Sequence, residues 1–202
     1  MTISTKEKIF YISLDLFSQK GFSGVSIREI TREVGIKESS LYNHFSSKDE
    51  ILESILNFFR EDFSKTLPPL ETLNEILQKH SVESFLRAGL HNFKKYMEDE
   101  TGQKMWRLLQ VEQFRSPLAR EIILHDLYGK TIEFLEIVFT KFIEFKKIRP
   151  YNPKVLAIEY QYPVFSLLTE YNILKFDGKG TAEVEKKLEQ HIDFFLNTIL
   201  EK

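Results

Sequence analysis

Apolar positions recur about every 3.6 residues along almost the whole chain, and this spacing is typical of α-helices with one buried face. The first such segment predicts a helix over residues 5–20, whose apolar face carries Ile9, Ile12, Leu16 and Phe17. Gly21 follows as the residue that would end this helix. Glycine and proline are too scarce for the many turns of a β protein, so we predict an all-α fold.

Serine caps and glycine stops divide the next part of the chain. Ser26 and Glu29 form a capping box that begins a second, short helix, and Gly35 ends it. A third short helix is expected over residues 37–45, and a longer fourth helix ends before two prolines at positions 68 and 69. Beyond them, the pattern predicts helices over residues 71–78, 81–99, 102–114, 117–147, 153–176 and 181–200. Gly129 interrupts the pattern of the 117–147 segment, which is therefore one helix or two.

Two short helices joined by a glycine turn, with a longer helix before them, form the pattern of a three-helix helix-turn-helix unit. In the third helix, Leu41 and Phe45 are expected to point inward. What remains outside is a polar edge, which consists of Lys37, Ser39, Ser40, Tyr42, Asn43 and His44. Small serine and asparagine side chains let a helix approach base edges in the major groove, and longer side chains reach the phosphates beside it.

Composition narrows the functional classes. The 202 residues include no cysteine, which excludes disulfides and thiolate chemistry. The five histidines show no metal-ligand spacing, and no phosphate-binding loop or hydrolase motif is present, so we predict neither an enzyme nor a metal site nor a cofactor. The N-terminus lacks the apolar segment of a signal peptide and no run of 18 apolar residues occurs, which favours a cytoplasmic protein without a membrane partner.

The charge is distributed unevenly. The formal net charge is -2, but residues 1–48 carry seven Lys and Arg against five acidic residues, a net of +2, which leaves -4 for the remainder. A mildly basic N-terminal part is the side on which a polyanion would bind, although two charges are weak evidence alone.

Several spaced residues over the first quarter of the chain carry a family resemblance. They are Gly21-Phe22, Gly35-Ile36 and the run from Leu41 to Asp49, which reads Leu-Tyr-x-His-Phe-x-x-Lys-Asp. In order and spacing this part resembles the TetR family of bacterial transcriptional repressors. It departs from the family pattern at three positions, where Thr31 replaces an alanine, Lys37 a serine cap and Ser39 a smaller residue.

The resemblance implies a DNA-binding domain over residues 1–47 and a helical ligand-binding and dimerisation domain over residues 48–202. Phosphates would be contacted by Ser26, Tyr42, His44 and Lys48, with Arg28 at the start of the second helix. Lys37, Ser39, Ser40 and Asn43 would face the groove. Without the resemblance, Tyr42 packing on its neighbours and His44 capping local carbonyls are simpler interpretations. Glu38 is expected to be solvated.

The last two helices are apolar on more than one side, which implies a partner surface. The resemblance implies a homodimer formed by a two-fold four-helix bundle of these helices. The residues predicted for the dimer interface are Leu156, Tyr160, Val164, Leu167, Tyr171, Leu188, Ile192, Phe195 and Ile199.

Aromatic residues crowd the middle of the chain. Most are expected to be core, but the resemblance implies a cavity for a small-molecule inducer of unknown identity, and some would line it. The candidates are Phe93, Tyr96, Trp106, Phe114, Tyr128, Phe139, Tyr162 and Phe165. His91, Arg107 and Glu112 would supply charge to the ligand or lie on a solvated face.

These observations predict a ligand-responsive regulator, a repressor that binds a palindromic double-stranded DNA operator as a homodimer and is released by its inducer. The rival hypothesis is a helical dimeric ligand-binding protein whose N-terminal unit contacts protein or membrane instead of DNA. The weak positive charge favours the rival, and the polar edge favours DNA.

Overall fold

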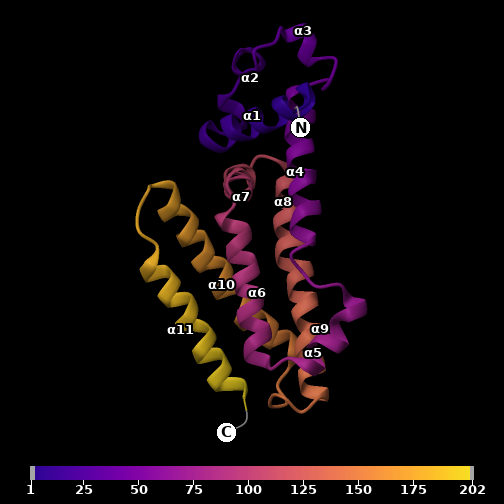
Figure 1. The fold of residues 1–202 in the computed structure, drawn as a ribbon, viewed down its shortest axis with the longest axis vertical. Helices are drawn as coiled ribbons and strands as arrows, with labels where there is room; N and C mark the ends of the chain where they lie inside the picture. The colour runs from indigo at the N-terminus through magenta and orange to yellow at the C-terminus, as the bar shows by residue number, and fades with distance from the viewer. Residues whose placement is uncertain (1–2, 201–202) are drawn as a thin grey trace. The chain divides into compact units, whose positions relative to one another are not determined.

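The computed structural model describes residues 3–200, and these form helices joined by short loops, without a β-strand (Figure 1). The all-α prediction is confirmed. The α-helices are α1 (Thr5–Lys20), α2 (Ile27–Val34), α3 (Glu38–Leu41), α4 (Lys48–Ser64), α5 (Leu70–Lys79), α6 (Val82–Glu98), α7 (Glu100–Glu112), α8 (Pro117–Glu121), α9 (Thr131–Glu144), α10 (Pro153–Phe176) and α11 (Ala182–Ile199). A 3-10 turn, η1 (Phe22–Gly24), and a π-helical segment, η2 (Ile122–Lys130), complete the described part.

The chain divides into two compact units, and each is built from separate parts of the sequence. The first unit, Met1–Ser64 with Glu98–Leu124, contains α1 to α4, α7 and α8. The second, Lys65–Met97 with His125–Lys202, contains α5, most of α6, α9, α10 and α11. The unit that holds the helix-turn-helix therefore also includes α4, α7 and α8.

In the first unit, α1 packs on α2, α4 and α7. Its sequence explains both ends, because Ser4 and Glu7 form a capping box and the Gly21 N–H group bonds to Phe17. Phe17 is fully buried, and burying a phenylalanine side chain contributes roughly 2–3 kcal/mol. Ile30 and Leu41 are also fully buried, which anchors α2 and α3 in the same core.

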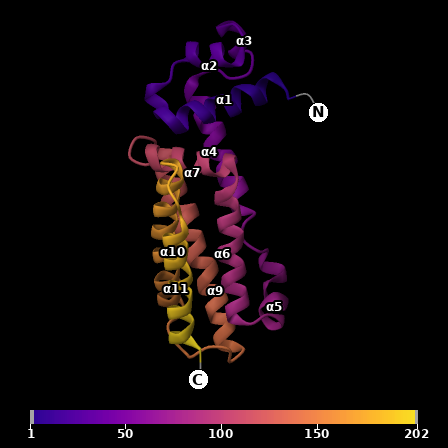
Figure 2. The same ribbon diagram turned by 60° about the vertical axis from the view of Figure 1, so that its left-hand side comes forward.

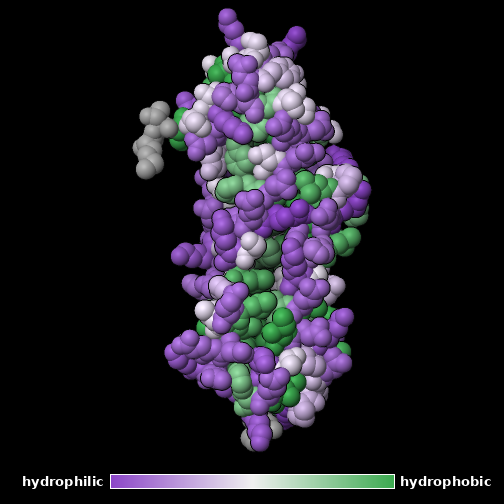
Figure 3. Space-filling model, turned by 90° about the vertical axis from the view of Figure 1, so that its right-hand side faces the viewer, coloured by the Kyte–Doolittle hydropathy of each residue, from purple (hydrophilic) through white to green (hydrophobic). Residues whose placement is uncertain are grey.

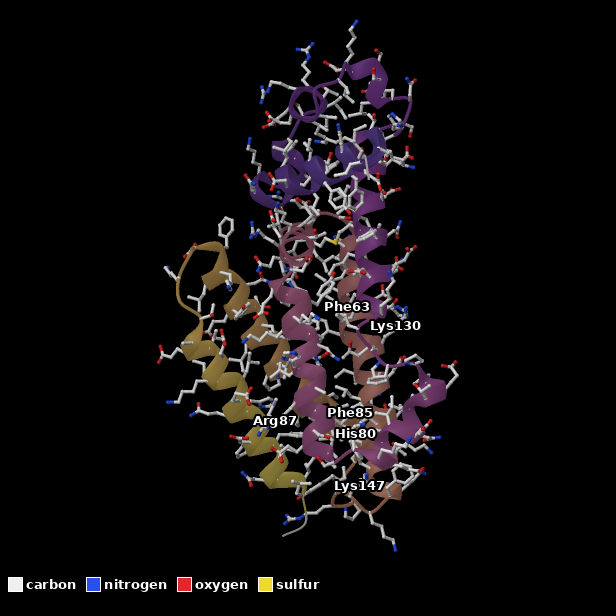
Figure 4. All side chains as sticks on the ribbon, viewed as in Figure 1. Phe63, His80, Phe85, Arg87, Lys130 and Lys147 are labelled. Atoms are coloured by element: carbon white, nitrogen blue, oxygen red, sulfur yellow. The ribbon has the colours of Figure 1, made fainter. Side chains whose placement is uncertain are left out.

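In the second unit, α10 lies side by side with α9 and α11 around one hydrophobic core (Figures 1 and 2). Charged side chains tie further helices to this unit. Arg87 of α6 points toward α11, where it pairs with Glu189 and Asp193 (Figure 4). Lys147 donates to the carbonyl oxygens of Leu77, Gln78 and His80, and so satisfies the carboxyl end of α5.

The predicted helix over residues 117–147 continues through Gly129 without ending. Between α8 and α9 the helix widens into the π-helical segment η2, which includes Gly129. π-Helical segments are rare and are frequent at functional sites, because the extra residue per turn changes which side chains face inward. Asp126 of this segment is buried and accepts a 2.6 Å hydrogen bond from Lys130.

The third helix is shorter than the predicted range 37–45. Regular α-helix covers only Glu38–Leu41, and the chain then continues in turns to Phe45, whose N–H group bonds to the Leu41 carbonyl oxygen. His44 also donates to Leu41, in the tighter three-residue spacing. The polar edge is therefore carried partly on turns and partly on helix.

None of the described helices has the length and apolar character that crossing a lipid bilayer requires. One face of the molecule is mainly hydrophilic and shows its hydrophobic side chains in separate patches (Figure 3).

Candidate nucleic-acid interface

The turn between α2 and α3 has a clear local cause. Gly35 has φ 79°, a left-handed conformation that glycine adopts without strain, and its N–H group bonds back to Thr31 and Arg32. At the other end of α2, the Ser26 hydroxyl oxygen accepts a 3.2 Å hydrogen bond from the Glu29 N–H group. A cap at each end fixes the length of α2 and the direction in which α3 leaves it.

The polar edge lies on the outside of the first unit. Leu41 and Phe45 are 0% and 2% exposed and hold α3 against the core. Tyr42 is 52% exposed, and the other members of the edge are exposed or half-buried: Lys37, Ser39, Ser40, Asn43 and His44. Every side chain of the polar edge is therefore accessible from solvent.

Two ion pairs adjust the charge beside this edge. Arg28, a predicted DNA contact, is exposed and its Nε atom lies 3.1 Å from Glu38 Oε1. An exposed pair of this kind contributes at most about 1 kcal/mol, so Arg28 can exchange Glu38 for a phosphate at little cost. Lys20 donates to Glu29 in the first turn of α2, and this bond holds the pKa of the Glu29 carboxyl below its usual value.

Lys48 has a different environment from the one expected of a phosphate contact. Its Nζ atom donates to the carbonyl oxygens of Phe22 and Val25, at 2.9 and 2.7 Å, and lies 4.1 Å from the centre of the Phe22 ring. Two of its three N–H donors are thus used within the protein. The structure assigns Lys48 to bracing the loop before α2, with one donor remaining.

Five of the predicted ligand-contacting residues lie together in the second unit. Phe93 and Tyr128 flank Phe165, with ring centres 6.2 and 5.1 Å from it. Tyr162 stacks on Tyr128 at 5.2 Å, and Tyr96 lies 6.5 Å from Phe93. We name these five residues the aromatic cluster. Burial and the neighbouring Tyr162 raise the pKa of Tyr128, so its hydroxyl remains a hydrogen-bond donor well above neutral pH.

The other three predicted ligand contacts lie elsewhere. Phe114 follows the end of α7 and is 84% exposed, because the helical pattern that would turn it inward ends at Glu112. Phe139 is fully buried in the core of the second unit, where it packs on Tyr160 and Phe195. Trp106 is 2% exposed within the first unit, whereas the aromatic cluster belongs to the second.

The charged residues predicted to supply charge to the ligand also lie in different environments. His91 is exposed. Burial lowers the pKa of Arg107, an effect that the nearby Asp15 partly opposes. Glu112 is 1% exposed and its Oε1 atom accepts a hydrogen bond from the Phe22 N–H group, so it serves the helix-turn-helix side of the molecule. A single glutamate at an inward helical position gives no sequence signal of such a distant partner.

The side chains predicted for the dimer interface lie inside their own subunit. Eight of the nine are at most 6% exposed, and Leu167 is half-buried against the same core. In the single subunit these side chains are thus covered by its own helices. A second apolar stripe of α10 and α11 is exposed, at 36% to 72%, and we name it the outer stripe: Val155, Ile158, Tyr162, Ile173, Phe176 and Phe194.

Among residues 3–200, no three His, Asp or Glu side chains are grouped so that they could hold a metal ion.

Comparisons with known proteins agree with this geometry. Residues 13–55 match the family model described as bacterial regulatory proteins, tetR family. The chain is 40% identical over 124 residues to YttP of Bacillus subtilis, named as a probable HTH-type transcriptional regulator, with 61% of this chain and 58% of YttP covered. It is 40% identical over 58 residues to the biofilm operon negative regulator IcaR of Staphylococcus epidermidis, with 27% and 31% covered. The chain thus spans less than two thirds of the length of these relatives.

The fold also matches a solved structure along nearly its whole length. The SmeT–triclosan complex superimposes with a TM-score of 0.71 at 16% identity, with 98% of this chain and 92% of that chain covered. At this identity the likeness shows the fold alone. The two relatives are named as transcriptional regulators and not as enzymes.

Proposed function

Because residues 13–55 match the model of the tetR family of bacterial regulatory proteins, we propose that the chain is a cytoplasmic transcriptional regulator of this family that binds duplex DNA through the polar edge. The observation that carries this proposal is the exposure of the edge. Tyr42 and Asn43 face solvent at the end of the helix-turn-helix. Its other side, at Leu41 and Phe45, is buried in the core. Within residues 3–200, the polar side chains of the edge make no hydrogen bond or ion pair.

The chemistry of the edge suits a divided role. Asn43 and Ser39 are short hydrogen-bonding side chains that reach base edges in the major groove. Tyr42 and His44 are longer, and with Ser26 at the start of α2 they suit phosphates on either side of the groove. Lys48 contributes by holding the loop before α2. Two of its N–H donors bond to the carbonyl oxygens of Phe22 and Val25, and the third has no hydrogen-bond partner among the described residues.

A homodimer is part of the proposal. The outer stripe presents six exposed apolar side chains on α10 and α11, and a surface helix of a soluble monomer normally turns such side chains inward. A two-fold contact through this stripe would present two copies of the polar edge, which is the arrangement that reads a palindromic operator with half-sites about 34–36 Å apart.

A small-molecule ligand is the third part. The aromatic cluster brings five rings together from α6, η2 and α10, and its tyrosine hydroxyls can orient a ligand. IcaR is named a negative regulator, which supports a repressing role here. The ligand would release DNA by binding more tightly to the conformation that does not fit the operator.

The test is selection of duplexes from a random pool by the full chain, followed by electrophoretic shift titrations over a range of salt concentrations. We expect one enriched palindromic sequence, with binding that weakens steeply as salt rises because lysines and arginines displace counterions from phosphates. Recovery of no enriched sequence, or equal binding to all duplexes, would overturn the proposal.

A further inference from the structure

Helix α7 holds the helix-turn-helix at two points. Near its start, Lys104 Nζ lies 2.7 Å from Asp15 Oδ1 of α1. At its last residue, Glu112 Oε1 accepts a 2.8 Å hydrogen bond from the Phe22 N–H group in the loop between α1 and α2. The two points are eight residues apart, about 12 Å along the helix. Helix α7 therefore contacts both α1 and the loop that leads into α2.

The Glu112 contact is unusual because of its burial. The residue is 1% exposed, and within residues 3–200 its carboxylate has no ion pair and no hydrogen-bond donor other than the Phe22 N–H group. Removing a carboxylate from water costs several kcal/mol, and one charge-assisted bond offsets only part of that cost. An apolar side chain would pack there at lower cost. Stability alone therefore does not explain why a glutamate occupies position 112. The position in which it holds the Phe22 N–H group does explain it.

The same peptide segment is also held by α4. Lys48 donates to the carbonyl oxygens of Phe22 and Val25, while Glu112 accepts from the Phe22 N–H group. A carboxylate of α7 and an ammonium group of α4 thus bracket one short loop. Val25 directly precedes Ser26, the cap of α2, so the position of this loop sets where α2 begins.

The loop can only take this path because of Gly21. Its φ of 73° lies in the left-handed region, and a Cβ atom there would lie 3.5 Å from Glu112 Oε1. The turn after α1 therefore brings the Phe22 N–H group directly onto the end of α7.

We propose that Glu112 is a positioning residue for DNA binding. By holding the Phe22 N–H group, it fixes the orientation of α2 and α3 that places the polar edge in the groove, and it makes that orientation depend on α7. Helix α7 follows α6 after the single residue Asp99, and α6 carries Phe93 and Tyr96 of the aromatic cluster. This inference rests on the proposed function and adds to it a residue through which α7 acts on the DNA-binding surface.

The test compares two substitutions. Glu112→Gln keeps a neutral oxygen that can accept from the Phe22 N–H group, whereas Glu112→Met has a similar volume and no such oxygen. Glu53→Met makes the same chemical change at an exposed position of α4 and is the control. The readouts are fluorescence anisotropy with the duplex selected by the wild-type chain and with a random duplex, urea unfolding, and hydrogen exchange of the Phe22 amide by NMR.

Because Glu112→Met lacks the hydrogen bond that positions the Phe22 N–H group, we expect its affinity for the selected duplex to fall about ten-fold or more. Stability against urea and binding to the random duplex stay close to wild type, and the Phe22 amide exchanges faster. Glu112→Gln is expected to retain binding within about three-fold and to be measurably weaker than wild type, since a neutral acceptor forms the weaker bond. Glu53→Met binds like wild type.

Wild-type affinity in Glu112→Met overturns the inference and leaves the proposed function intact. An equal loss in Glu112→Gln and Glu112→Met also overturns it, because the lost hydrogen bond would then not be the cause. If Glu112→Met fails to fold, Glu112→Gln decides alone: faster exchange of the Phe22 amide with unchanged affinity for the selected duplex overturns the inference. A wild-type chain that selects no duplex overturns the proposed function and the inference together.

Discussion

The ammonium group of Lys48 lies 2.9 Å from the carbonyl oxygen of Phe22 and 4.1 Å from the centre of its ring. The same group bonds to Val25, so one side chain of α4 satisfies two carbonyl oxygens that precede α2 and covers an aromatic face. Lys48, which is predicted to contact a phosphate, thus also braces the DNA-binding unit.

Replacement of Lys48 is expected to affect folding as well as DNA binding. Lys48→Met removes two hydrogen bonds from a charged donor, each of which contributes about 1.5–3 kcal/mol, so we expect a loss of about 3 kcal/mol or more in the free energy of unfolding. Binding to every duplex falls with it. Urea unfolding followed by circular dichroism, beside anisotropy titrations, measures both.

The control for Lys48 is Lys37→Met, at an exposed position of the polar edge. It should weaken DNA binding and leave the urea midpoint within error of wild type. Equal stability of the two variants would contradict the bracing role of Lys48.

Substitutions in the polar edge should affect DNA affinity and sequence specificity differently. Tyr42→Ala is expected to weaken binding to all duplexes by a similar factor, because a phosphate contact carries no sequence information. Asn43→Ala should cost about 1–3 kcal/mol on the preferred base pair and less on its alternatives, which flattens the preference at one operator position. Titrations against a set of single-base operator variants distinguish the two patterns, and the same pattern for both substitutions would show that the roles are misassigned.

The outer stripe should control association. Phe194→Asp and Ile173→Asp place a charge at positions that are 72% and 59% exposed in the single subunit, and each is expected to convert a dimer to a monomer of unchanged helix content. Ile137→Asp, at a 40% exposed position of α9, is the matched control and should stay dimeric. Sedimentation velocity at several concentrations gives the result. A monomeric wild-type chain, or variants that associate like wild type, would contradict the proposed dimer through the outer stripe.

Glu185 should make a pH-dependent contribution to stability. Hydrogen bonds from Lys94 and Thr181, at 2.7 and 2.6 Å, lower the pKa of its carboxyl from the ordinary 4.5. A pKa lowered by folding stabilises the native state at pH values above 4.5, and this contribution is lost as the pH falls through the folded-state pKa. Because the pair is partly exposed, the effect is at most about 1 kcal/mol.

We therefore expect Glu185→Gln to be less stable than wild type at pH 7 and to approach the stability of wild type as the pH falls below 4.5. Urea midpoints measured from pH 7 downward give the comparison. Glu183→Gln changes a carboxylate of the same helical turn that makes no hydrogen bond among the described residues, and it should show no such trend. A wild-type advantage that grows on acidification would have the opposite sign to the one derived.

Local signals in the sequence predicted most of the fold. The capping residue Ser26 begins α2 as expected, since a serine cap acts on an N–H group only three residues away. The predicted ranges 153–176 and 181–200 agree with α10 and α11 within one residue. The outward position of the polar edge could be predicted for the same reason. Leu41 and Phe45 are four residues apart and lie on one helical face, and this spacing shows which face is buried.

Contacts between residues that are far apart in the chain could not be predicted from the sequence. The helical pattern of α10 shows two apolar stripes, and nothing local tells which one faces the subunit's own core, so Tyr160 and Leu156 were assigned to a partner. Glu112 and Phe22 are 90 residues apart, and periodicity carries no information on such a pair. The π-helical widening at η2 was also missed, because a glycine within a helical pattern is compatible with a break, a bulge or neither.

The central claim is that the polar edge enters the DNA groove, and the absence of cysteine from the chain allows a direct test. Asn43→Cys introduces a single thiol, to which an iron chelate that cleaves DNA within a short radius can be attached. On the selected duplex the account predicts two short clusters of cleavage, related by the two-fold axis of the operator and about one helical turn or a multiple of it apart. The same chelate attached through Glu53→Cys should give weaker cleavage at other positions. Cleavage from position 43 that is absent, or no stronger and no more localised than from position 53, would contradict the claim.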